Sequence, residues 1–268
     1  SAITTSTATI SWTASVPPPA NGYDYYYSTT NTSPTSMTTP SGSTTVGVTT
    51  ANLTMLIGST TYYFWARGNC GSGDFSAWST GASFTTACSA TTIPYTQDFE
   101  SVTIPAIPTC TSIQNAGTGN NWITSSNPGS GFTSKTLQYS YNSSNAANAW
   151  FYTQGLTLNT GTTYKLTYRY GNNGFTEKLK VALGTSADFS SMITIADHPS
   201  VTGSVPITNT VTITVPSNGT YYVGFNAYSA ANQFYLFVDD ISIIVAPSCD
   251  VPTAIVASAI TATSATIS

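Results

Sequence analysis

Carboxylates are few among the side chains that could do chemistry in this chain. Its 268 residues include ten Asp and Glu, and four of these form two close pairs, Asp98 with Glu100 and Asp239 with Asp240. A glycosidase needs two carboxylates that face one another across a sugar. Asp239 and Asp240 cannot be such a pair, because adjacent strand residues point to opposite faces. Nothing near Asp98 and Glu100 indicates a cleft. We therefore predict no catalytic residues.

The single histidine and the four cysteines further limit the kinds of catalytic and metal sites that the chain could form. His198 lies in an Ala-Asp-His-Pro-Ser stretch, which is typical of a solvated loop rather than of a catalytic triad. The cysteines show no short pairing that would indicate a metal or redox site; they are Cys70, Cys88, Cys110 and Cys249. Widely spaced cysteines in a Thr-, Ser- and Tyr-rich chain favour disulfides in an oxidising compartment. We therefore predict an extracellular or cell-surface protein.

Aromatic side chains offer a candidate binding site, because planar rings can stack on the faces of sugars. Tyr139 and Tyr141 alternate on one face of a predicted strand beside Asn142, and we predict that they form an exposed shelf for a glycan. The alternative is that these tyrosines are present only because the residue type suits strands. Trp150 stands in a strand of mixed pattern and is predicted to lie in the core.

The overall composition excludes several kinds of partner. Charged residues make up 6% of the chain and the formal net charge is −4, so no polybasic surface for nucleic acid is expected. Hydrophobic residues still reach 40%, which is enough for a packed core. No apolar run approaches the roughly 20 residues of a membrane-spanning helix, so we predict no membrane insertion. The chain starts and stops in mid-pattern, and we expect it to be part of a longer protein.

Sequence patterns typical of β-strands, which would position these residues, occur along the whole chain. Residues alternate with a period of two in many short segments, separated by Gly, Pro and Asn clusters; examples are 8–12, 23–27, 62–66, 166–170, 211–215 and 221–225. Helix-favouring Glu, Lys and Leu are scarce. The pattern predicts an all-β chain of sandwiches or barrels.

The two ends of the chain repeat one another. Ser1–Ser11 and Ser258–Ser268 are identical at eight of eleven positions, with an offset of 257 residues. Low-complexity Ser/Thr sequence produces some such matches, but the ordered match of the Ile and Ala residues favours a true repeat. The chain is then one repeat period followed by the opening of the next.

Residues 1–88 resemble a fibronectin type III module. The matching segments are ATISW, YDYYYST and LIGSTTYYFWARGNCGSGDFSAWS, at Ala8–Trp12, Tyr23–Thr29 and Leu56–Ser79. The resemblance implies an Ig-like sandwich in which the Tyr62 hydroxyl bonds to backbone at a strand corner, while Phe64 and Ala66 face the core. The family's first strand is missing before Ser1, and its equivalent by the repeat is Cys249–Ala257.

Residues 89–248 resemble a second family, the choice-of-anchor J jelly roll, which is related to MAM domains. The matching segments include IPYTQDFES, NAWFYTQGLTL, TYKLTYRY and YLFVDDISI, at Ile93–Ser101, Asn148–Leu158, Thr163–Tyr170 and Tyr235–Ile243. Members of this family typically lie in long modular surface proteins of bacteria that use type IX secretion. There they alternate with fibronectin modules, as adhesins or as accessory modules of hydrolases. Residues 249–268 would begin the next fibronectin module.

The jelly-roll resemblance also implies where the acids lie. Terminal strands of a jelly roll are close together, so hard oxygen ligands for a structural Ca²⁺ are predicted to converge at Asp98, Glu100, Asp239 and Asp240. Strand alternation places Asp239 inward, on the side of Phe237. The alternative is that these acids bond only to backbone amides or to Arg169.

The main functional prediction is a structural and adhesive repeat unit of a long extracellular filament, which assembles head-to-tail with neighbouring copies of itself. The alternative is a carbohydrate-binding accessory module of a secreted hydrolase, whose partners would be surface glycans. A fibronectin module without its first strand leaves a sheet edge open. The tail Cys249–Ser268 of one unit would complete the sandwich of the next unit.

Strand direction in such a module then predicts the cysteine pairing. Cys70 lies at the end at which the first strand begins, so Cys70 and Cys249 are predicted to bridge to neighbouring repeats. Cys88 and Cys110 remain, and they are predicted to pair with one another across the domain junction. The main alternative joins Cys110 to Cys249.

Overall fold

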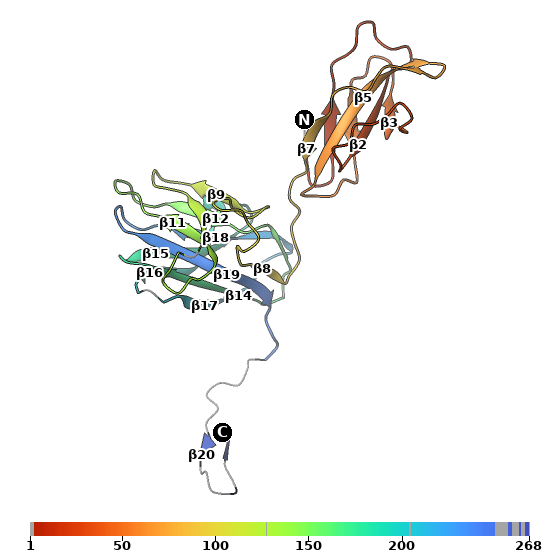
Figure 1. The fold of residues 1–268 in the computed structure, drawn as a ribbon. Coiled ribbons are helices and arrows are strands. Elements are labelled where there is room, and N and C mark those ends of the chain that lie inside the picture. The colour runs from red at the N-terminus through yellow and green to blue at the C-terminus, as the bar shows by residue number, and fades with distance from the viewer. Residues whose placement is uncertain are drawn as a thin grey trace. The chain divides into compact units, whose positions relative to one another are not determined.

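The structure, a computed structural model, describes residues 3–126, 128–203, 205–249, 257–258, 263 and 266–267. This part of the chain consists of β-strands joined by turns, with one short 3₁₀ turn at Phe189–Ser191, so the all-β prediction is confirmed. None of these residues belongs to a helix long and apolar enough to cross a bilayer. Contacts divide the chain into two compact units (Figure 1).

The first unit consists of the described residues of Ser1–Thr91 together with two short segments from later in the chain, Thr109–Ser112 and Tyr152–Leu156. One of its antiparallel sheets pairs β1 (Ala8–Ser11) with β4 (Thr50–Leu53). The other sheet has the order β3–β2–β5–β6, with β7 on the first half of β5. Its strands are β2 (Tyr23–Ser28), β3 (Gly42–Thr44), β5 (Thr61–Gly71), β6 (Asp74–Phe75) and β7 (Ala82–Thr85).

A tyrosine fixes the corner at which β5 begins. The Ile57 N–H donates to the Tyr62 hydroxyl at 2.9 Å, which is the backbone bond predicted for this side chain. The Tyr62 ring is buried and stacks on Phe84, with 5.7 Å between the ring centroids. Ala66 is also buried, and Phe64 packs partly buried against the same core. The loop before β5 is thereby tied to the core of the unit.

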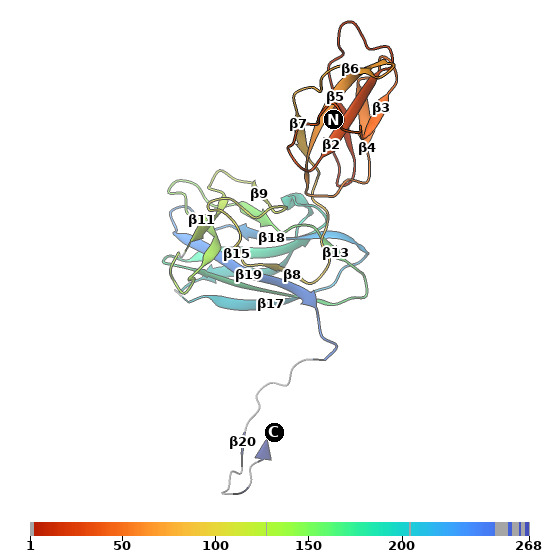
Figure 2. The same cartoon turned by 45° about the vertical axis from the view of Figure 1, so that its right-hand side comes forward.

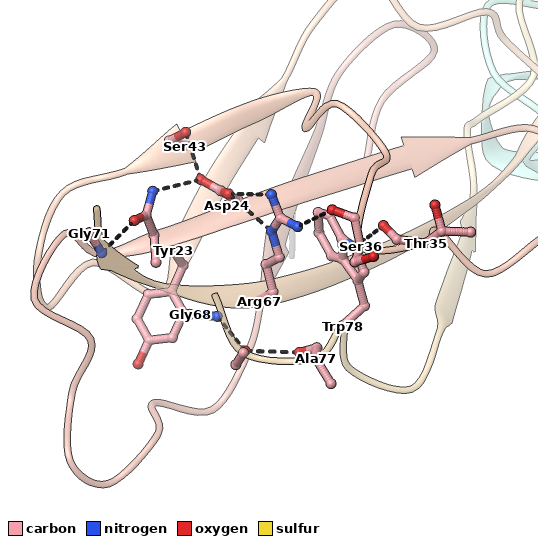
Figure 3. A network of polar contacts seen from close by, with 12 residues as sticks. Tyr23, Asp24, Thr35, Ser36, Ser43, Arg67, Gly68, Gly71, Ala77 and Trp78 are labelled. Carbon is pink, nitrogen blue, oxygen red and sulfur yellow. Dashed lines mark hydrogen bonds and ion pairs between the residues drawn. The ribbon is translucent and has the colours of Figure 1, made fainter. Parts of the chain in front are cut away.

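A buried ion pair joins β2 to β5 (Figure 3). Asp24 and Arg67 lie opposite one another on the two strands, and their side chains are 4% and 5% exposed. Arg67 Nε and Nη2 donate to Asp24 Oδ2, each at 3.1 Å, and Ser43 Oγ donates to Asp24 Oδ1 at 3.0 Å. The guanidinium lies over the Phe75 ring at 4.0 Å and over the Trp78 ring at 4.6 Å. Both charges therefore have specific partners in place of water.

The second unit is a sandwich of two six-stranded sheets (Figure 2). In one sheet the strands follow the order β10–β11–β19–β14–β17, and β8 also pairs with β19. The strands of this sheet are β8 (Tyr95–Gln97), β10 (Trp122–Ser126), β11 (Lys135–Ser140), β14 (Tyr164–Asn172), β17 (Ile207–Ile213) and β19 (Tyr235–Val245). In the other sheet the order is β16–β15–β18–β12–β9, and β13 also pairs with β18. The strands of this second sheet are β9 (Ser112–Asn115), β12 (Ala149–Tyr152), β13 (Leu156–Leu158), β15 (Glu177–Gly184), β16 (Ile193–Val201) and β18 (Gly219–Ala227).

Apolar side chains that alternate along these strands fill the space between the two sheets. Leu166 and Tyr168 of β14 and Phe225 of β18 are fully buried, and the Tyr168 and Phe225 rings meet edge to face at 5.4 Å. Trp150 is 9% exposed, which confirms its predicted place in the core. The period-two pattern of the sequence thus identifies the residues that hold the sandwich together.

β8 and β19, the first and last strands of this sandwich, lie side by side, as the jelly-roll resemblance implied. Gln97 of β8 opposes Ile241 of β19 in the antiparallel register. β11 and β14 flank the first half of β19 and run antiparallel to it. The ends of β11 and β14 therefore meet the beginning of β19.

The predicted pair Cys88 and Cys110 forms a disulfide, and the alternative pair of Cys110 with Cys249 is wrong. Both bonded cysteines belong to the first unit. Cys70 and Cys249 are exposed free thiols. Their bridges to neighbouring copies stay a prediction.

Most of the predicted beginning of the next repeat, residues 249–268, lies outside the described residues. The described part of this stretch includes an antiparallel pairing of β20 (Ala257–Ser258) with β21 (Thr266–Ile267). The strand predicted at Cys249–Ala257 falls almost entirely outside what the structure describes.

Candidate functional site

The structure brings only some of the four predicted acidic ligands close to one another. Asp98 and Asp240 line one narrow groove of 140 Å³ beside β8 and β19. Asp240 accepts from Arg169 Nη1 at 2.9 Å, which is the partner that the alternative interpretation named. Glu100 accepts from the Lys135 N–H at 2.9 Å. Within the described residues, no three Asp, Glu, His or Cys side chains gather closely enough to hold a metal. Ca²⁺ at these acids stays a prediction.

Asp239 points inward, as strand alternation predicted. It is 2% exposed, and its Oδ1 accepts from the Asp240 N–H at 2.8 Å. Desolvation by burial raises the pKa of Asp239 to about 7, against the lowering effects of that backbone bond and of the Arg169 charge. At neutral pH this carboxyl is therefore protonated in a large share of the molecules, which lowers the cost of burying it.

Tyr139 is not part of an exposed shelf, contrary to the prediction. Its ring is 1% exposed and meets Trp122 edge to face at 5.9 Å. Its hydroxyl accepts from the Asn120 N–H at 3.2 Å, and burial raises its pKa. The alternation that put Tyr139 and Tyr141 on one face fails because β11 ends at Ser140. Tyr141 therefore leaves the sheet and is partly exposed.

Tyr141 belongs to a group of four rings at the end of the sheet, named the aromatic cluster: Tyr141, Phe175, Phe234 and Tyr235. Phe234 is its centre. The Phe234 ring centroid lies 5.7 Å from that of Tyr141, 4.4 Å from that of Tyr235 and 6.5 Å from that of Phe175. Phe175 is 62% exposed, and the other three rings are partly exposed. The cluster thus offers ring surface to solvent.

The strand order explains why residues far apart in the sequence meet in the aromatic cluster. Tyr141 follows the end of β11, Phe175 follows the end of β14, and Phe234 immediately precedes β19. β11 and β14 both flank β19 and run antiparallel to it. Sequence reasoning found Tyr141 but missed Phe175 and Phe234, because only the order of strands in the sheet brings these loops together.

Asparagine amides and backbone bonds frame the aromatic cluster. Asn120 Nδ2 donates to the Tyr141 carbonyl at 2.9 Å, and the Tyr141 N–H donates to the Phe234 carbonyl at 2.9 Å. The Asn232 N–H donates to the Asn142 carbonyl at 2.8 Å. Such bonds fix the loops that carry the rings. Exposed rings beside amide groups suit a sugar, whose apolar face stacks on a ring while its hydroxyls bond to donors and acceptors.

His198 lies on strand β16 and not in the solvated loop that the sequence indicated. Its Nε2 is 2.7 Å from the Tyr168 hydroxyl, and its ring stacks on Tyr170 at 4.1 Å. Burial lowers the pKa of His198, against the opposing charge of Asp197. Pro199 does not end the strand because β16 is an edge strand, which tolerates proline. The partner of this histidine is the buried Tyr168 hydroxyl, and burial raises the pKa of Tyr168, which disfavours its charged phenolate form.

No family model and no curated protein matches this chain. Its fold is similar to that of several solved β-sandwich domains. The K1 cleaved adhesin domain of Lys-gingipain from Porphyromonas gingivalis W83 is 19% identical, with a TM-score of 0.47 over 57% of this chain and 99% of that one. The CBM22-1 xylan-binding domain of Paenibacillus barcinonensis Xyn10C is 10% identical, with a TM-score of 0.40 over 58% and 95%. The C-terminal CBM6 of LamC from Zobellia galactanivorans is 16% identical, with a TM-score of 0.34 over 50% and 98%. These likenesses concern the fold alone.

Proposed function

We propose that this chain is a non-catalytic adhesive module of an extracellular protein, and that it binds carbohydrate through the aromatic cluster. The observation that carries the proposal is the cluster itself. Its rings come from three separate segments, remain partly exposed, and are held in place by backbone bonds at the ends of strands. A phenylalanine that is 62% exposed, such as Phe175, contributes little to a core and is available to a ligand.

The extracellular location is supported by the disulfide between Cys88 and Cys110, because disulfides persist in oxidising compartments. The adhesive role is supported by the chemistry of the surroundings. The amides of Asn120 and Asn142 are engaged within the protein, but Asn232 is exposed in the loop before Phe234, and its side-chain amide can bond to sugar hydroxyls both as donor and as acceptor. A binding site of this kind needs no charge on its ligand.

The experiment is a glycan array probed with the full chain, followed by calorimetric titration of a glycan that the array selects. Phe175→Ala is expected to weaken binding about tenfold or more, because it removes the most exposed ring of the cluster. Phe189→Ala is the matched control, because Phe189 is 48% exposed in the same unit but lies outside the cluster. Absence of any bound glycan, or equal losses in the two variants, would contradict the proposal.

A second candidate function is the head-to-tail assembly predicted from the repeat, and an open sheet edge favours it. Among the described residues β1 pairs with β4 on one side, while a single bridge between Ile3 and Ala8 occupies the other. A groove of 160 Å³ beside this edge has a mixed lining, whose apolar side chains include Ile10 and Phe84. A strand such as Cys249–Ala257 of another copy would pair with the edge and cover the groove.

Light scattering on the full chain tests this assembly. Association that rises with concentration, and that is lost when residues 249–268 are removed, is the expected result. A monodisperse monomer at high concentration would contradict the head-to-tail contact and would leave carbohydrate binding untouched.

A further inference from the structure

Two lysines gather over one tyrosine ring on the outer face of the sheet that contains β15. Lys178 and Lys180 lie two residues apart on this strand, so their side chains point to the same side. Leu179 and Val181 are fully buried in the sandwich, which places the lysines on the outside. Lys180 Nζ lies 4.4 Å and Lys178 Nζ 5.8 Å from the centroid of the Tyr228 ring. All three of these residues are partly exposed.

The strands on either side of β15 hold the tyrosine ring across it. Tyr228 directly follows β18, and its hydroxyl donates to Asp197 Oδ1 on β16, while β15 lies between those two strands (Figure 1). The Tyr228 N–H also donates to the Lys178 carbonyl at 3.2 Å. Burial, the bond to Asp197 and the charge of Asp197 raise the pKa of Tyr228, so its hydroxyl stays protonated as the donor to this carboxylate. The ring thereby gives the two lysine stems a fixed surface to pack on.

Lys178, Lys180, Tyr228 and Asp197 are named the lysine patch. The two ion pairs in the described part of the chain use Arg67 and Arg169, so neither ammonium group of the patch is paired with a described carboxylate. The patch holds two of the six basic residues of a chain whose formal net charge is −4. An aromatic ring attracts a cation but carries no charge to neutralise it. An anionic group on a ligand would supply the missing counter-charge.

The lysine patch adjoins the aromatic cluster. Glu177, the first residue of β15, accepts through Oε1 from the Phe234 N–H, and Lys178 is the next residue along the strand. Phe175 precedes Lys178 by three residues, so their Cα atoms lie at most about 11 Å apart. A glycan of a few sugars that stacks on the Phe175 ring is therefore long enough to reach the lysine side chains.

We propose that the glycan bound by this chain is acidic, and that Lys178 and Lys180 hold its carboxylate or sulfate group while a neighbouring sugar stacks on Phe175. The part played by Phe175 rests on the proposed function, whereas the recognition of the anionic group rests on the lysine patch. A lysine ammonium is a compact charge with three donors on a flexible stem, so it suits either kind of anion. Neutral sugars remain ligands of the rings and bind less tightly.

The test compares acidic glycans with their neutral forms by calorimetric titration into the full chain. One pair is an oligogalacturonate and its methyl ester, and the other is a sulfated galactan oligosaccharide and its desulfated form. At low salt, wild type is expected to bind at least one acidic form about tenfold or more tighter than its neutral form. The pair that shows this preference identifies the anionic group as carboxylate or sulfate. Added NaCl should reduce the preference, because the lysines are partly exposed.

Substitution of the lysines locates the preference. Lys178→Met and Lys180→Met keep an unbranched stem beside the Tyr228 ring and remove the charge. Each is expected to lower the preference for the acidic form, and the double variant to abolish it, while Lys180→Arg keeps it. Lys165→Met is the matched control, because Lys165 is an exposed lysine on β14, in the other sheet of the same unit. Melting temperatures equal to that of wild type would show that a loss of binding is not a loss of folding.

The proposal is overturned if wild type binds the acidic and neutral forms equally, or if it binds neither acidic form. An equal loss of preference in Lys165→Met also overturns it, because the attraction would then not belong to the lysine patch. Equal binding of both forms that depends on Phe175 would leave the proposed function intact. Lysine-dependent binding that Phe175→Ala does not weaken would support recognition of the anionic group and contradict carbohydrate binding by the aromatic cluster.

Discussion

Breaking the buried ion pair of the first unit should cost far more than breaking an exposed one. Arg67→Met removes the guanidinium and leaves the Asp24 carboxylate with Ser43 and Asn69 as its side-chain donors, in a site where the side chain is 4% exposed. Removing one partner of such a pair typically costs about 3–5 kcal/mol, because the other charge stays buried without compensation. The lost contacts of the guanidinium with the Phe75 and Trp78 rings add to this cost.

Differential scanning calorimetry of the full chain measures the effect. For a unit of this size each kcal/mol shifts the melting temperature by about 4–8 °C, so Arg67→Met should lower the melting of the first unit by about 12 °C or more. Arg169→Met is the matched control, because the Arg169–Asp240 pair is 34% and 49% exposed and such pairs contribute at most about 1 kcal/mol.

Replacing both partners separates the pair energy from the burial cost. Arg67→Met combined with Asp24→Leu should recover part of the stability that Arg67→Met alone loses, because no unpaired charge remains. If Arg67→Met costs no more than Arg169→Met, or if the double variant is simply the sum of its parts, the argument from burial is refuted.

Three further predictions concern single bonds and one titrating group. Tyr62→Phe should destabilise the first unit by about 1–3 kcal/mol in urea unfolding, because the Ile57 N–H loses its acceptor. An unchanged urea midpoint would show that this hydrogen bond does not stabilise the unit. Replacing Cys88 and Cys110 by Ser should cost about 3 kcal/mol, the chain-entropy value for a separation of 22 residues, and the same unfolding measurement checks it. Because burial lowers the pKa of His198 below 6.5, the unfolded chain takes up a proton near pH 6.5 while the folded chain does so only at lower pH. Stability of the second unit should therefore fall as the pH drops through about 6.5, and His198→Gln should reduce this fall.

Local patterns predicted the strands and the direction of their side chains where a strand runs on unbroken. Asp239 was expected to point inward because residues two apart share a face, and the structure agrees. The same rule failed for Tyr139 and Tyr141, because the last residue of a strand cannot be read from alternation alone. His198 was misread because a following proline normally indicates a loop, although an edge strand accepts it.

The candidate binding surface could not be predicted from the sequence, because it depends on the order of the strands in the sheet. Phe175 and Phe234 stand in loops that no local pattern connects, and they meet only because β14 and β19 are neighbours. Glu177 did leave a local signal, since it alternates with Leu179 and Val181 on the inward face of β15. A charged residue in register with a core is a reason to look for a buried partner.

The most direct test of carbohydrate binding at the aromatic cluster is an NMR titration of the isotope-labelled full chain with an oligosaccharide chosen from the array. We expect the backbone signals of Tyr141, Phe175 and Phe234 to shift with saturating dependence on the sugar concentration, while those around Phe189 stay in place. Shifts that saturate elsewhere, with the signals of the cluster unmoved, would contradict it.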